Sequence, residues 1–119
     1  MAAAVALAWL GMYVHNVMDL PDLTPASPEN TGPALVWLAL LGLWWAQRDR
    51  PWPAALLLGW AGLNLLGALI TVLPLPVLPF KPEQSLRHYA FHALYVLAVT
   101  PVLVLLRLHL RSFRAEPSC

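Results

Sequence analysis

Cysteine and charge are both scarce in this chain of 119 residues. The one cysteine, Cys119, excludes an internal disulfide framework and any zinc site built from several cysteines. Charged residues make up only 11% of the chain, whereas an ordinary soluble domain carries roughly 25%. No basic cluster of the kind that binds nucleic acid is present. Because so few polar groups cannot cover a globular surface, we expect a lipid bilayer to be the solvent for most of the chain.

Hydrophobic residues, by contrast, make up 60% of the sequence and fall into four runs. The intervening segments are rich in proline or charge and cannot continue a helix. A helix of about 20 apolar residues crosses the hydrocarbon core of a bilayer. The sequence therefore predicts an all-α membrane protein, a single integral membrane domain over residues 1–119 with four transmembrane helices in an up-down bundle. We expect these helices at about residues 2–20, 33–47, 53–73 and 83–110.

The first apolar run could in principle be a cleaved signal peptide. It lacks the positively charged start of a signal peptide. We therefore expect it to be retained as the first helix.

The distribution of lysine and arginine predicts how the chain sits in the membrane, because cytoplasmic loops carry an excess of both. One side of the predicted bundle carries five such residues: Arg48, Arg50, Arg107, Arg111 and Arg114. The other side carries only Lys81 and Arg87. We expect a multi-pass protein of the cell membrane with both termini in the cytoplasm, and with loops 21–32 and 74–82 outside.

Two pairs of ionisable residues lie inside the apolar runs at helical spacing. His15 and Asp19 are four residues apart in the first run, and His88 and His92 are four apart in the last. Each pair therefore lies on one face of its helix. Such residues are costly in hydrocarbon and often mark functional sites. The first and last helices of an up-down bundle are neighbours, so both pairs are expected in one layer near the outer surface.

Three imidazoles and a carboxylate form a ligand set that suits a transition-metal ion. We predict that His15, Asp19, His88 and His92 bind Zn, Cu or Fe, with a role in holding or transporting the ion. Asp19 or Glu83 could also orient one of the imidazoles. The residues expected to line or support the site are Asn16, Asn64, Glu83, Tyr89 and Tyr95. Asn64, in the middle of the third run, is expected to form a hydrogen bond to another helix.

Other uses of the same residues stay open. His15 and His92 could both be axial ligands of a haem, although no C-x-x-C-H motif for covalent attachment is present. Catalysis is possible only through the metal, because no serine, threonine or cysteine falls beside the cluster. An ion path is disfavoured because the ionisable residues stop at one side of the predicted bundle.

A structural role is the remaining alternative. Histidines near the headgroups can reach water or a backbone carbonyl at little cost. A chain this small could also be a homo-oligomer or an accessory subunit of a larger membrane complex, with the polar side of the first helix against a partner. The expected partners are therefore the lipid bilayer and other protein chains, but no nucleic acid.

Overall fold

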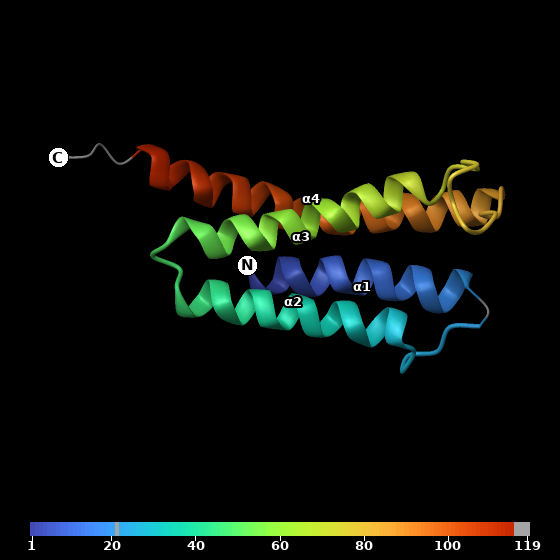
Figure 1. The fold of residues 1–119 in the computed structure, drawn as a ribbon, viewed down its shortest axis with the longest axis horizontal. Coiled ribbons are helices and arrows are strands. Elements are labelled where there is room, and N and C mark those ends of the chain that lie inside the picture. The colour runs from blue at the N-terminus through green and yellow to red at the C-terminus, as the bar shows by residue number, and fades with distance from the viewer. Residues whose placement is uncertain (21, 116–119) are drawn as a thin grey trace.

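The computed structural model describes residues 1–20 and 22–115, and Pro21 and Cys119 lie outside this part. The described residues form four helices and no strand. The helices are α1 (Ala2–Asp19), α2 (Pro28–Ala46), α3 (Pro51–Ile70) and α4 (Leu86–Ala115). They alternate in direction along the chain (Figure 1). The predicted all-α class is therefore confirmed for this part of the chain.

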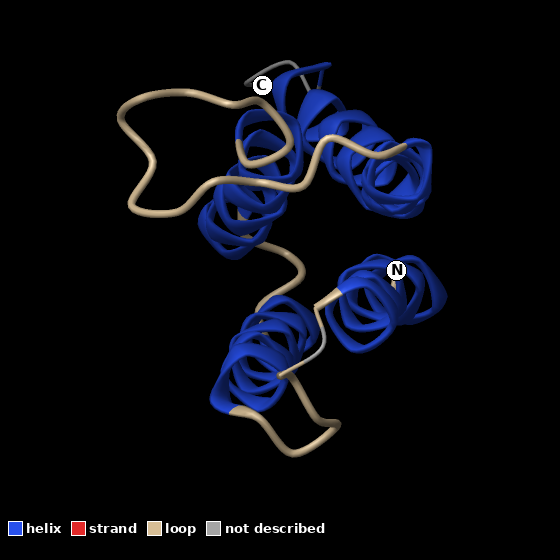
Figure 2. Ribbon diagram, turned by 90° about the vertical axis from the view of Figure 1, so that its right-hand side faces the viewer, coloured by secondary structure: helices blue, strands red, loops and turns tan. Residues whose placement is uncertain are grey.

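Helix α4 is the helix on which the bundle is built, since α1 and α3 both pack extensively against it. Helix α2 completes a ring by contacting α1 and α3 (Figure 2). Ala8, Val99 and Leu106 are fully buried along this core. At Gly11, an added Cβ would lie only 2.5 Å from the Cβ of Ala98. The first and last helices are therefore close neighbours, as the sequence predicts.

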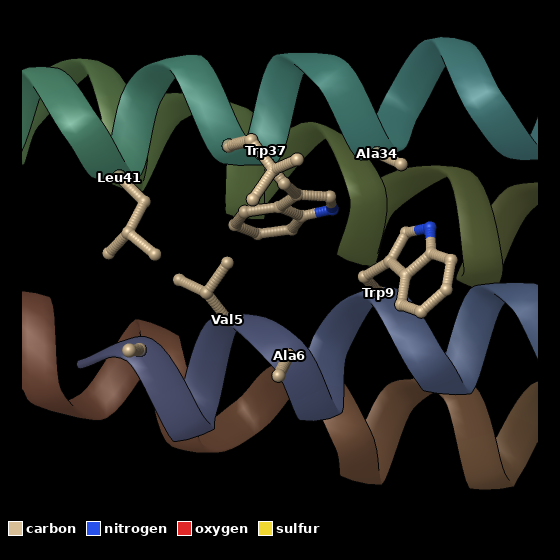
Figure 3. Close-up of a pocket in the computed structure, with 8 residues that line it drawn as sticks. Val5, Ala6, Trp9, Ala34, Trp37 and Leu41 are labelled. Carbon is tan, nitrogen blue, oxygen red and sulfur yellow. The ribbon is translucent and has the colours of Figure 1, made fainter.

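Helix α2 is held less tightly than the other three. Only Asn30 and Trp37 of its residues are buried. An apolar cavity of about 340 Å³ lies between α1 and α2, bordered by residues that include Val5, Trp9 and Trp37 (Figure 3). The Trp9 indole N–H donates to the carbonyl oxygen of Asn30 at 3.5 Å. Polar contacts near Asn30 are thus important for fixing the start of α2.

The limits of three helices differ from those predicted, and α3 spans Pro51–Ile70 where residues 53–73 were expected. Helix α2 begins at Pro28, with Ser27 at its N-cap, so Pro33 lies inside it. The predicted start at residue 33 was wrong because Pro28 already provides a favourable first turn, and Glu29 complements the helix dipole there. Helix α4 begins at Leu86 and reaches Ala115. Glu83 therefore precedes this helix and is not part of it.

Among the described helices, α3 and α4 are long and apolar enough to cross a membrane. Helix α1 falls short of this standard although it has 18 residues, since His15, Asn16 and Asp19 are polar. The first turns of α2 are also polar. The two apolar helices suggest membrane association, and four spans stay a prediction.

Candidate metal centre

Three buried imidazoles lie together at the end of the bundle where α1 ends and α4 begins. One potential ligand atom from each of His15, His88 and His92 lies within 4.8 Å of the others. The Nε2 atoms of His15 and His92 are 3.0 Å apart. The ring of His88 packs against that of His92, with 4.5 Å between centroids. The helices α1 and α4 thus bring together the three histidines that the sequence grouped.

The Nδ1 atoms of two of these rings face oxygen atoms that can only accept a hydrogen bond. The Nδ1 of His92 lies 2.6 Å from the carbonyl oxygen of Ala68 in α3. The Nδ1 of His88 contacts the Asp19 carboxylate. A carbonyl and an ionised carboxylate have no proton to donate. His88 and His92 therefore each donate through Nδ1–H.

A relay of amides determines the proton position on His15. The Asn30 amide N–H donates to the carbonyl oxygen of Thr24 at 2.8 Å. The oxygen of that amide consequently accepts from the Asn16 Nδ2 at 2.9 Å. This leaves the Asn16 Oδ1 facing the Nδ1 of His15 at 3.0 Å. An amide oxygen only accepts, so His15 also donates through Nδ1–H.

With each Nδ1 occupied by an oxygen partner, the Nε2 of each ring is the nitrogen left for a further contact. The Nε2 of His88 is buried and has no hydrogen-bond partner in the described structure. The Nε2 atoms of His15 and His92 are 3.0 Å apart, so either a proton held by one of them or a metal ion bound by both joins the two nitrogens. Two imidazoles on a tetrahedral zinc ion, with bonds of about 2.0–2.1 Å, place their nitrogens roughly 3.3 Å apart. The His15–His92 separation is therefore close to that of a metal site, and the third ring nitrogen lies within 4.8 Å of these two.

Asp19 supports an imidazole more directly than it offers a ligand. Its side chain is 2% exposed and contacts the Nδ1 of His88. Its Oδ2 lies 3.8 Å from the Nε2 of His15. A carboxylate that accepts from a ligand histidine fixes the ring orientation and raises the ring's basicity. Of the two roles expected for Asp19, the orienting one fits these contacts better.

Two cavities adjoin the cluster. The larger one, of about 520 Å³, is called the vestibule here and is bordered by all three histidines, Asp19, Lys81 and Glu83. A lateral cavity of about 330 Å³ touches His15 and His92 but not His88. The cluster thus lies at the floor of the vestibule.

Of the other residues expected at the site, all except Tyr89 border one or both of these cavities. Asn64 and Tyr95 border the lateral cavity, and the Tyr95 hydroxyl donates to the Asn64 Oδ1 at 2.7 Å. This contact confirms the predicted hydrogen bond from Asn64 to another helix. Glu83 is exposed in the vestibule wall. Tyr89 is 42% exposed, donates to Gln84 and borders neither cavity, so the structure does not bring it to the cluster.

Two groups that support the cluster are missing from the sequence-based prediction: the Ala68 carbonyl, which accepts from His92, and Asn30, which bonds the Asn16 side chain beside His15. Asn30 is only 1% exposed, yet asparagine is common in loops and the sequence placed it in one. The Ala68 carbonyl belongs to the backbone, so the identity of residue 68 does not indicate that it accepts a hydrogen bond from a histidine. Asn30 had a weak signal, as a polar residue near the end of the loop that joins the first two helices.

Comparison of the chain with family models, with curated proteins and with solved structures finds no match. The candidate site therefore stands on its geometry.

Proposed function

We propose that this chain binds one transition-metal ion through the Nε2 atoms of His15, His88 and His92. The observation that carries the proposal is that one ring nitrogen from each of the three histidines lies within 4.8 Å of the others, while the Nδ1 of each ring lies beside an oxygen atom. Neutral imidazole with a hydrogen-bonded second nitrogen is the usual form of a ligand histidine. Zn, Cu and Fe all suit such a ligand set.

We further propose that the protein is a multi-pass membrane protein that holds or transfers this ion near the outer surface. Large apolar side chains are exposed on α2, α3 and α4, including Leu35 (67%), Leu63 (62%) and Leu97 (69%). Acyl chains are a favourable environment for these side chains. The arginines of the 47–50 turn and the end of α4 support a cytoplasmic location for the opposite end of the bundle.

A single ion is favoured over haem as the occupant. Haem ligands lie on opposite faces of a flat macrocycle, whereas the rings of His15 and His92 are 4.4 Å apart, centroid to centroid. His88 also packs beside them. Haem insertion would therefore require α1 and α4 to separate at this level.

A subunit role is the second candidate, and it is favoured by the surface of α2. This helix has few buried residues, and Leu35 and Leu38 are more than half exposed. The apolar cavity beside Trp37 adds to this surface. A partner chain or a second copy that packs on α2 would bury these groups without using the histidines.

Elemental analysis of protein purified in mild detergent, without a His-tag, tests the metal proposal. We expect about one Zn, Cu or Fe ion per chain. The double variant His88→Ala/His92→Ala should lose this ion. His109→Ala is the matched control, because His109 lies near Trp44 and Phe113 rather than in the cluster. Metal retained by the double variant would refute the assignment, and a Soret band in the purified protein would indicate haem.

A further inference from the structure

The proposed site contains three nitrogen ligands, which leaves a tetrahedral ion with one further position. Within the described residues, the group of side chains that can share an ion consists of the three imidazoles. Structural zinc sites are closed by four protein ligands, whereas three protein ligands leave room for water or another exogenous ligand. Three protein ligands therefore indicate a fourth coordination position that an exchangeable ligand can occupy.

The vestibule is the cavity that such a position would face. All three imidazoles border it, whereas only His15 and His92 border the lateral cavity. Its volume of about 520 Å³ accommodates several small molecules. Lys81 and Glu83, both exposed, contribute opposite charges to its wall. A small polar ligand can therefore reach the metal site from this side.

The charges around the ion favour an anion in this position. A divalent ion with three neutral imidazoles carries +2, and the buried Asp19 carboxylate brings the total to +1. An unbalanced charge in a buried site is unfavourable. One monovalent anion on the metal would bring the total to zero, whereas a fourth neutral ligand would leave it at +1.

We propose that the vestibule admits a small monovalent anion that coordinates the metal, with hydroxide as the ligand when no other anion is present. This inference rests on the proposed metal site and concerns its ligand class. Such a centre exchanges ligands with the outer solution and differs from a closed structural site. The three imidazoles would hold the ion, and the ion would supply Lewis-acid chemistry at its open position.

Azide titration of the cobalt-substituted protein tests the proposal. Metal-free protein in detergent is loaded with Co²⁺, and the visible absorption is recorded while azide is added at constant ionic strength with perchlorate. We expect strong bands of four-coordinate cobalt that shift saturably with azide. Wild-type protein that binds Co²⁺ but whose spectrum ignores azide would overturn the anion site and leave the metal site standing. Protein that fails to bind Co²⁺ would overturn both.

Charge variants in the vestibule wall test whether azide binds beside the vestibule. Glu83→Gln should tighten azide binding and Lys81→Gln should weaken it, each by roughly twofold, because these charges are exposed and partly screened by salt. Asp49→Asn, in the turn at the opposite end of the bundle, is the matched control and should leave azide binding unchanged. Equal azide affinities in all three variants would show that the anion is not bound beside the vestibule.

Discussion

Asn30 determines the direction of a hydrogen-bond relay that runs from the Thr24 carbonyl to the ring of His15. Its side chain donates to Thr24 and accepts from Asn16. Without it, the Asn16 amide is free to turn its N–H toward His15. His15 would then carry its proton on Nε2, where a metal ion has to bind.

We therefore predict that Asn30→Leu weakens metal affinity by about 10-fold, at the lower end of the effect expected for an orienting partner. Competition with a chromophoric chelator measures this change. Thr31→Val is the control, because the Thr31 hydroxyl bonds only within α2, to the Ser27 carbonyl. Equal affinities for wild type and Asn30→Leu would show that the relay does not set the proton position of His15.

Asp19 accepts a hydrogen bond from His88 and also carries a negative charge. Two substitutions at Asp19 distinguish the effects of these two properties. In Asp19→Asn an amide oxygen can still accept from Nδ1–H, whereas Asp19→Ala removes the acceptor. We expect the alanine variant to lose about 10- to 100-fold in metal affinity and the asparagine variant to lose less. Asp22→Asn, an exposed site, serves as the control. The same chelator competition measures all three, and an alanine variant with unchanged affinity would exclude the orienting role.

The residues of the cluster differ in how far the sequence could predict them. His15 and His92 were predictable, because ionisable residues in apolar helices are costly in hydrocarbon and are expected to face the interior of the bundle. The Ala68 carbonyl was not, because every residue carries one. Asn30 was missed because two prolines close to it, Pro28 and Pro33, made both a loop and a helix start plausible.

Among the helices, the α1–α4 contact is the one that assembles the cluster, and Gly11 permits it. The Cβ of an alanine here would meet the Cβ of Ala98 at 2.5 Å. These helices would then have to move apart, and this movement would also separate His15 from His92.

Gly11→Ala should accordingly destabilise the fold by about 1–3 kcal/mol, as overpacking does, despite the better helix propensity of alanine. Thermal unfolding in detergent measures this, and metal affinity should fall in parallel. Gly42→Ala is the control, because an added Cβ at Gly42 meets nothing within 4 Å. A stability gain in both variants would mean that α1 and α4 are not in close contact at Gly11.

At the scale of the whole molecule, short connections make consecutive helices run in alternating directions. The sequence could therefore predict the four helices and their up-down order. The start of α2 could not be predicted in the same way. Its position depends on a choice between Pro28 and Pro33 as the first-turn proline, and contacts of Asn30 with α1 favour the earlier one.

The membrane arrangement is testable with single cysteines in a Cys119→Ser background. We predict that a membrane-impermeant maleimide labels intact cells when the cysteine replaces Lys81, in the 71–85 segment beside the cluster. It should not label them when the cysteine replaces Asp49, in the opposite turn, until the membrane is permeabilised. The reverse pattern would contradict the orientation given by the arginines, and labelling of both would contradict a membrane-spanning arrangement.

The imidazoles of His15 and His92 lie 77 residues apart in the sequence, so an ion bound to both would close most of the chain into a ring. A chain with one cysteine has no internal disulfide to do this. Because a ligand that binds only the folded state stabilises it, an ion at about 100 times its Kd would add about 2.7 kcal/mol. Metal supply would then govern how long each copy survives proteolysis, independently of any chemistry at the ion.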